Sequence, residues 1–165
     1  MGAALSEGTV YSFEMDEDNV KRLRSNVELN NQTESVCIEQ LALTDSVGQV
    51  RYSKHPGEQS VTYGLSGRGD RGNMQVEVSS TTVDAYCRNR VETVDLLKVD
   101  VEGGELKVLR GALETLHQFH PDLLVEVHPA RLGEGGESAQ EVLRLLVESG
   151  YTVQSFWTSG NIRKR

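Results

Sequence analysis

Asp100 and Glu102 are the residues whose type and spacing most directly suggest chemistry. Both follow the apolar run of residues 94–99, and Gly103 comes next. In a continuing strand, two residues separated by one position lie on the same face. Two neighbouring carboxylates can bind a hard cation, act as a base or hold an amine of a ligand. The alternatives are that one of them caps the following helix, or that Lys98 neutralises Asp100 in an ion pair.

Other polar side chains stand at the ends of predicted strands. Glu14 follows residues 10–13, and Glu126 and His128 end the run of residues 122–128. His128 can act as a base near neutral pH, although a histidine before a proline is commonly structural. An acid at the tip of an early strand can accept hydrogen bonds from ribose hydroxyls. The alternative for Glu14 is a solvated acid at the start of a helix.

A strand, a glycine-containing turn and a helix must position the Asp100–Glu102 pair. Residues 94–101 have apolar side chains on both faces, at Val94, Leu96, Leu97, Val99 and Val101, which predicts a central strand of a covered parallel sheet. Leucines then recur at helical spacing and predict one amphipathic helix: Leu106, Leu109, Leu113 and Leu116. This arrangement places both carboxylates at the carboxyl edge of an α/β sheet, where ligands bind.

The remaining chain alternates predicted strands and helices. Strands are predicted over residues 10–13, 36–43, 49–53, 74–78, 122–128 and 151–157. Helices are predicted to begin at residues 16–18, with an end at 30–31, at Thr82 with a threonine cap, and at Ser138 with an end at Gly150. Residues 130–138 are expected to be a loop. The pattern favours a three-layer α/β domain with a mostly parallel sheet and an antiparallel insertion across 49–78.

We expect residues 1–165 to form a single domain. Within it, residues 1–9 are predicted to be an N-terminal loop, residues 54–73 a glycine-rich mobile loop, and residues 158–165 a tail. The loop contains Gly67 to Gly72, which fits G-x-G-x-x-G. That motif binds a dinucleotide only between a strand and the start of a helix. Here no strand leads in and a strand follows, so we interpret it as a surface loop.

The composition of the chain argues against several classes of partner and location. The net charge is −8 over 165 residues, which argues against a nucleic-acid backbone as the main partner. No apolar run reaches the length of a membrane span, and no secretory signal is visible. The two cysteines form no disulfide framework, so the cytoplasm is expected. Neither the cysteines nor His55, His117 and His120 have metal-ligand spacing, and no metal site is predicted from them.

Several short segments, taken in order, resemble the FkbM family of S-adenosylmethionine-dependent methyltransferases. The most specific is Lys98 to Gly103, which reads Lys-Val-Asp-Val-Glu-Gly. The others are residues 10–16, 26–30, 41–45 with Gly48, 82–84, Glu105, 109–112 and 124–128. The resemblance runs from about residue 9 to residue 157 and depends on the order and spacing of these segments.

The resemblance implies a Rossmann-like class I methyltransferase fold and methyl transfer, usually to a hydroxyl oxygen of a sugar or natural product. It implies that Glu14 binds the ribose of S-adenosylmethionine and that Ala42, Leu43 and Asp45 lie near its adenine. Asp100 would sit beside the methionine end of the cofactor or the acceptor. Asp100 and His128 are the candidate bases for the acceptor hydroxyl, with Glu102 as a third candidate catalytic residue at the same turn.

One departure from the family pattern is expected to matter. The family begins with a strand and a glycine-rich turn that hold the methionine portion of the cofactor, and neither precedes residue 10 here. We therefore expect a sheet that lacks its usual first strand, and weak binding of S-adenosylmethionine by these 165 residues. The alternatives are a catalytically incompetent fragment or interaction module of the same fold and, with less support, a nicotinamide-dependent dehydrogenase. The acceptor and the oligomeric state are not indicated by the sequence.

Overall fold

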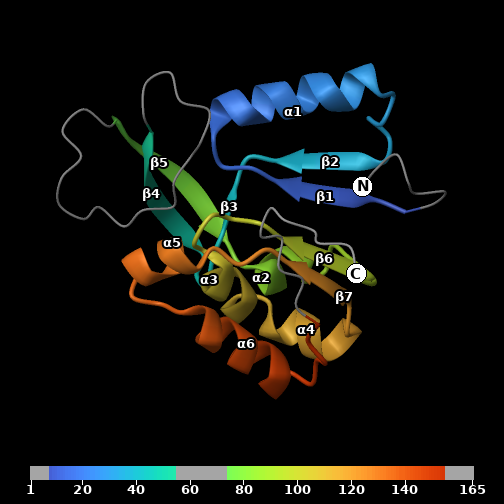
Figure 1. The fold of residues 1–165 in the computed structure, drawn as a ribbon. Coiled ribbons are helices and arrows are strands. Elements are labelled where there is room, and N and C mark those ends of the chain that lie inside the picture. Colours follow the sequence, from blue (N-terminus) through green and yellow to red (C-terminus); the bar gives the residue numbers. More distant parts are fainter. Residues whose placement is uncertain (1–7, 55–73, 155–165) are drawn as a thin grey trace, which may run out of the picture.

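The computed structural model describes residues 8–54 and 74–154, which form a mixed α/β fold (Figure 1). The strands are β1 (Val10–Phe13), β2 (Val36–Glu39), β3 (Ala42–Leu43), β4 (Gly48–Lys54), β5 (Met74–Thr81), β6 (Leu96–Val99) and β7 (Asp122–Val125). The helices are α1 (Glu17–Leu29), α2 (Val83–Cys87), α3 (Glu105–Arg110), α4 (Leu113–Phe119), α5 (Pro129–Glu134) and α6 (Ala139–Glu148). The α/β fold class predicted from the sequence is confirmed, and it is Rossmann-like in its parallel strand pairs joined through helices.

The described strands form three hydrogen-bonded sheets. β1 pairs with β2 in parallel, and β6 pairs with β7 in parallel, with Val99 opposite Val125. The third sheet has the order β3–β5–β4, in which β4 and β5 are antiparallel. The predicted antiparallel insertion is thus confirmed. Strand β4 extends one residue beyond the predicted strand of residues 49–53 at each end. Lys54 therefore belongs to the strand and not to the predicted loop. The rest of the predicted loop, residues 55–73, lies outside the described residues, as do residues 1–7 and 155–165.

The main core lies between β6–β7 and the helices of the C-terminal half. Val99, Leu106, Leu109 and Leu116 are buried there, and Val142 and Leu146 reach it from α6. Figure 1 shows α3, α4 and α6 gathered beneath β6 and β7. The other face of these strands is open in the described part of the chain.

The open face corrects one prediction. Leu96 is 45% exposed and Leu124 on the neighbouring strand is 56% exposed. Residues 94–101 are therefore not buried on both faces, because no described helix or strand covers the second face of this two-stranded sheet. The strand itself is also shorter than predicted and ends at Val99.

Tyr86 of α2 links this core to the first sheet. Its hydroxyl donates to Glu39 Oε1 at 2.7 Å, and its ring meets the ring of Phe13 edge-on at 4.7 Å between centroids. Helix α1 lies along β1–β2 (Figure 1), with Val20 and Val27 buried. Its N-cap is Asp16, whose side chain accepts from two backbone N–H groups of the first turn. The helix start and end agree with the prediction.

The single helix predicted after residue 104 is two helices, α3 and α4, separated at Gly111. A Cβ on Gly111 would overlap the backbone carbonyl oxygen of Thr44. The Gly111 carbonyl also accepts from the Asp84 backbone N–H at 2.9 Å. The break therefore lets the backbone of the chain approach the end of β3, and the apolar spacing of the leucines continues across it.

Three further boundaries differ from the predictions. The strand predicted over 36–43 is divided into β2 and β3, which belong to different sheets. The loop predicted over 130–138 contains α5, which begins at Pro129 and buries Leu132 completely. Proline is well suited to the first position of a helix, so Pro129 favours a helix start here. The prediction of a loop gave more weight to the glycines that follow. Tyr151 to Gln154 are not a strand. The predicted threonine cap, Thr82, is confirmed, and the helix predicted from Ser138 has that residue as its N-cap.

Candidate active site

The candidate active site lies at the carboxyl ends of β6 and β7. Because Val99 is paired with Val125, the next residues on the two strands, Asp100 and Glu126, come out side by side. The Glu126 backbone N–H donates to the Val99 carbonyl at 2.9 Å and extends this alignment. One ligand atom each of Asp100, Glu126 and His128 lie within 4.8 Å of one another. The predicted gathering of polar groups at this edge is therefore observed for the β6 and β7 residues.

His128 is held by a buried carboxylate. Its Nδ1 donates to Glu105 Oε1 at 2.7 Å, and the Glu105 side chain is 0% exposed. On the other side of the ring, Nε2 lies 3.7 Å from Glu102 Oε1 and 3.9 Å from Glu126 Oε1. Burial alone would lower the pKa of His128, but the hydrogen bond to Glu105 and the nearby carboxylate charges raise it above its ordinary value. The ring is thus fixed at one nitrogen and faces carboxylates with the other.

Glu105 was not predicted as a site residue. It is the first residue of α3, a position where acidic residues are common because they interact favourably with the helix dipole. Its position at the start of a helix therefore did not by itself indicate a site residue. Glu105 also accepts from the Gly103 backbone N–H at 3.1 Å, while its Oε2 is buried without a hydrogen-bond partner in the described part of the chain. A signal was available in the sequence: Glu105 stands three and four residues before Val108 and Leu109, on the apolar face of the helix.

The turn that carries Glu102 is tightly constrained. Glu102 and Gly103 have φ values of 53° and 107°, so the chain leaves the strand conformation here. A Cβ on Gly103 would lie 2.8 Å from Arg131 Cβ. The Glu102 side chain accepts from Arg131 Nε at 3.1 Å. The prediction that Asp100 and Glu102 share a strand face is therefore wrong, because β6 ends before both; they converge on His128 through the turn instead.

The two alternatives for the acid pair have different outcomes. Lys98 Nζ lies 2.7 Å from Asp100 Oδ2, so the ion pair is present. The capping alternative is not observed, since Gly104 is the N-cap of α3 and no side chain makes a cap hydrogen bond there. Asp100 therefore has one oxygen engaged by Lys98.

Glu14 follows β1, in a different sheet from the Asp100 cluster. Its Oε1 accepts from the Asp16 backbone N–H at 2.8 Å, and its Oε2 accepts from Asn19 Nδ2 at 3.3 Å. A carboxylate has further lone pairs for a ligand hydroxyl. Its neighbour Asp16 is buried and binds the Tyr52 hydroxyl at 3.1 Å and Lys54 Nζ at 2.7 Å. Glu14 is thus tied to the start of α1 rather than freely solvated.

The predicted adenine residues are in or next to β3. Ala42 is buried and pairs with Ser80 of β5, and Leu43 packs against the main core. Asp45 is exposed, and its Oδ1 accepts from the Thr44 hydroxyl at 3.2 Å. These residues belong to or follow the sheet β3–β5–β4, whereas the Asp100 cluster lies at the strand ends of the separate sheet β6–β7.

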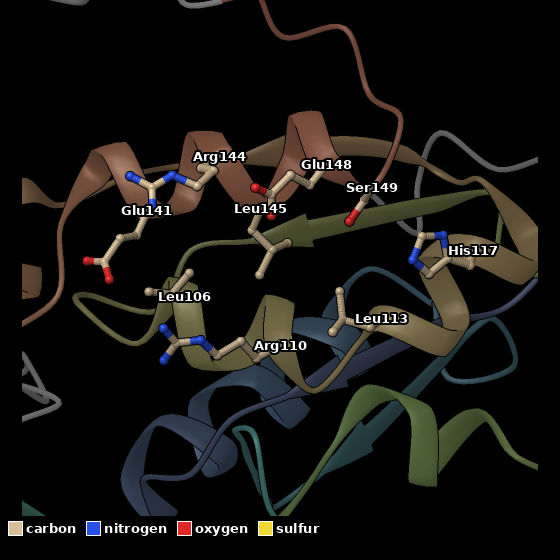
Figure 2. Close-up of a pocket in the computed structure, with 9 residues that line it drawn as sticks. All are labelled: Leu106, Arg110, Leu113, His117, Glu141, Arg144, Leu145, Glu148 and Ser149. Carbon is tan, nitrogen blue, oxygen red and sulfur yellow. The ribbon is translucent and has the colours of Figure 1, made fainter.

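A pocket of about 370 Å³ lies elsewhere, between α6 and the α3–α4 pair. Figure 2 shows Arg110, His117, Arg144 and Glu148 among the side chains that line it. None of the predicted site residues does so. Its lining mixes both signs of charge, and we do not assign the active site to it. No helix in the described part of the chain is long and apolar enough to cross a membrane.

Comparisons with known proteins bear on the fold and the family of the chain. No curated protein matches the chain. Its fold is similar to the crystal structure of methyltransferase FkbM from Methylobacillus flagellatus KT, with a TM-score of 0.53 at 16% sequence identity. The similarity covers 86% of this chain and 29% of that one, so the chain spans less than a third of the length of that protein. A family model of the methyltransferase FkbM domain matches residues 3–153. The chain therefore belongs to the methyltransferase FkbM domain family.

Proposed function

We propose that the protein is an S-adenosylmethionine-dependent methyltransferase that methylates a hydroxyl oxygen of a sugar or natural-product acceptor. Membership of the family supports methyl transfer. The observation that carries the proposal is the group of Asp100, Glu126 and His128 at the carboxyl ends of two paired parallel strands. Ligands of open α/β sheets bind at this edge.

The reaction needs alignment and removal of one proton. A group of the site would take the proton of the acceptor hydroxyl. Bound S-adenosylmethionine would supply the methyl group to the hydroxyl oxygen and would leave as a neutral thioether, with the carbon–sulfur electron pair on sulfur. Asp100, Glu102 and His128 are the candidate groups to receive the proton, because Asp100 and Glu102 each bring a carboxylate oxygen close to the His128 ring. Holding the two reactants in line supplies much of the acceleration.

We propose that the cofactor is bound mainly by residues of the N-terminal half of the chain. Glu14 at the end of β1 is proposed to bind the ribose hydroxyls, and Ala42, Leu43 and Asp45 to lie near adenine. Asp100 is proposed to approach the methionine end or the acceptor. The engagement of Glu14 with the start of α1 supports this role, since a fixed carboxylate needs less ordering when a ribose binds.

The partner is proposed to be a small molecule or glycan rather than nucleic acid, and the reaction to take place in the cytoplasm. The net charge of −8 and the carboxylates around His128 both disfavour a phosphate backbone. An interaction module without catalysis is the second candidate, and the open face of β6–β7 at Leu96 and Leu124 favours it.

Transfer of a labelled methyl group by the full-length gene product separates these candidates. Asp100→Ala is expected to lower the transfer rate at least about 100-fold, as loss of a proton acceptor or positioning carboxylate does. Glu34→Gln, on the exposed segment after α1, is the matched control. A folded protein that binds no S-adenosylmethionine and transfers no methyl group would favour the interaction module.

A further inference from the structure

We propose that Asp100, Glu126 and His128 bind a divalent cation, for which Mn²⁺ is the best match. The proposal deepens the proposed function and rests on it for the catalytic role of the cation, but not for binding itself. The sequence did not predict this site. Glu126 and His128 are 26 and 28 residues after Asp100, and only the pairing of β6 with β7 brings the three residues together.

The three ligand atoms lie close enough for side-chain rotation to bring them onto one cation. They lie within 4.8 Å of one another. Neighbouring ligands bound at about 2.1–2.3 Å around one ion are about 3.0–3.8 Å apart, so inward movements of up to about 1–2 Å complete the site. Two carboxylates and one imidazole nitrogen are a mixed oxygen and nitrogen set. Carboxylates suit Mg²⁺ and Mn²⁺, and imidazole suits transition metals, so Mn²⁺ satisfies both.

The buried Glu105 is the second, independent observation. Histidines that bind metals commonly donate their other ring N–H to a carboxylate, which fixes the orientation of the ring. Glu105 does this at 2.7 Å from Nδ1, so in the neutral ring the lone pair of Nε2 faces Glu102 and Glu126. The fully buried Glu105 also has one oxygen without a partner in the described residues. The buried carboxylate of Glu105 requires a nearby positive charge. A cation bound to Nε2 of His128, on the opposite side of the ring, would supply it.

The charges around the site leave room for one more cation. Lys98 engages Asp100 Oδ2, and Arg131 engages Glu102 Oε2 at 3.1 Å. Each contact occupies a single oxygen. Among the described residues no contact is made with Asp100 Oδ1, which can therefore bind a metal, and Glu126 contributes a carboxylate on a side chain that is 64% exposed. Lys98 is therefore a competitor at the edge of the site rather than an occupant of it.

The cation would give each carboxylate and the imidazole a distinct role. Three protein ligands leave positions open for the acceptor hydroxyl, whose pKa falls on coordination. With Asp100 and His128 engaged as ligands, Glu102 is the remaining group of the turn that can receive the hydroxyl proton. The methyl group then passes from sulfur to the bound oxygen, with the carbon–sulfur electron pair left on sulfur. The cation neither gains nor loses electrons in this sequence.

Mn²⁺ itself is the probe. Electron paramagnetic resonance of free Mn²⁺, titrated with chelator-treated protein, should show one site with a Kd at or below about 100 µM. Asp100→Asn and Glu126→Gln should each weaken binding at least tenfold. Glu105→Gln should weaken it about 10–100-fold through the ring of His128. Lys98→Gln should strengthen it, and Glu34→Gln should leave it unchanged. Thermal unfolding of every variant verifies that it is folded.

The outcomes separate this proposal from the proposed function. No binding at millimolar Mn²⁺ by the folded wild-type protein would overturn the site. Equal affinities of Glu126→Gln and Glu34→Gln would overturn it too. Binding lost in the ligand variants supports the site even if no methyl transfer is detected. Methyl transfer that persists in chelator, by a protein that binds no Mn²⁺, supports the enzyme and excludes the cation.

Discussion

The imidazole Nδ1 of His128 lies 2.7 Å from the carboxylate of the fully buried Glu105, and this contact joins the turn after β7 to the first residue of α3. It connects the carboxyl edge of the sheet to the core on which α3 packs. A side chain of the candidate site is thereby fixed by a fully buried residue that a ligand of the site does not need to touch.

Replacing Glu105 should therefore cost stability. Glu105→Ala removes both the partner of His128 and a packed side chain, and we expect the free energy of unfolding to fall by about 2–4 kcal/mol. Glu105→Gln retains the shape and should cost less. Glu114→Ala, which breaks the exposed pair with Arg88, is the control and should change stability by less than about 1 kcal/mol. Urea denaturation measures all three, and equal effects at positions 105 and 114 would contradict the structural role of Glu105.

Gly111 separates α3 from α4, and a side chain should not be tolerated there. Gly111→Ala places a Cβ against the Thr44 carbonyl, so we expect a loss of about 1–3 kcal/mol. Gly133→Ala is the matched control, because no atom lies within 4 Å of its Cβ position inside α5. It should be neutral or stabilising by up to about 1 kcal/mol. Thermal unfolding of both variants tests the pair, and a harmless Gly111→Ala would show that the break is not sterically required.

Asp16 should make the fold sensitive to acid. Burial alone raises its pKa, but hydrogen bonds from Lys54, the Asn19 backbone N–H and Tyr52 lower it below the usual value. A pKa that is lowered on folding stabilises the protein above the unfolded pKa of about 3.9, and this contribution is lost as the pH falls through the folded pKa. Asp16→Asn retains a helix cap but loses the charge, so we expect a cost of about 1–2 kcal/mol at pH 7.

That cost should shrink at acidic pH, as the pH falls through the lowered folded pKa of Asp16 and the wild-type carboxylate becomes protonated as well. Asp18 shares Lys54 but is exposed, so Asp18→Asn should have a much smaller effect at either pH. Urea titrations at the two pH values measure the difference. A cost for Asp16→Asn that does not depend on pH would contradict the assignment of the charge to this network.

Local pattern was sufficient for β1, α1, α6 and the starts of both helices, because their signals are short-range. The apolar spacing indicates the helices, and Asp16 and Ser138, where they were predicted to begin, are their N-caps. The turn after β6 was predicted to be a site from equally local signals, and that role stays a prediction. The break at Gly111 was not predictable, since it depends on the approach of the Thr44 carbonyl from another sheet. Neither was the pairing of Glu105 with His128, which are 23 residues apart and meet only after β6 and β7 align. The predicted roles of Glu14, Ala42, Leu43 and Asp45 stay predictions.

Methyl transfer from labelled S-adenosylmethionine tests the central claim most directly. The full-length gene product is incubated with the labelled cofactor and a panel of sugars and hydroxylated natural products, beside its Asp100→Ala and Glu34→Gln variants. The methyltransferase account predicts a labelled product whose rate falls at least about 100-fold in Asp100→Ala and is unchanged in Glu34→Gln. A product formed equally fast by folded Asp100→Ala would contradict the role of the strand-end cluster, and the absence of any labelled product would contradict the methyltransferase itself.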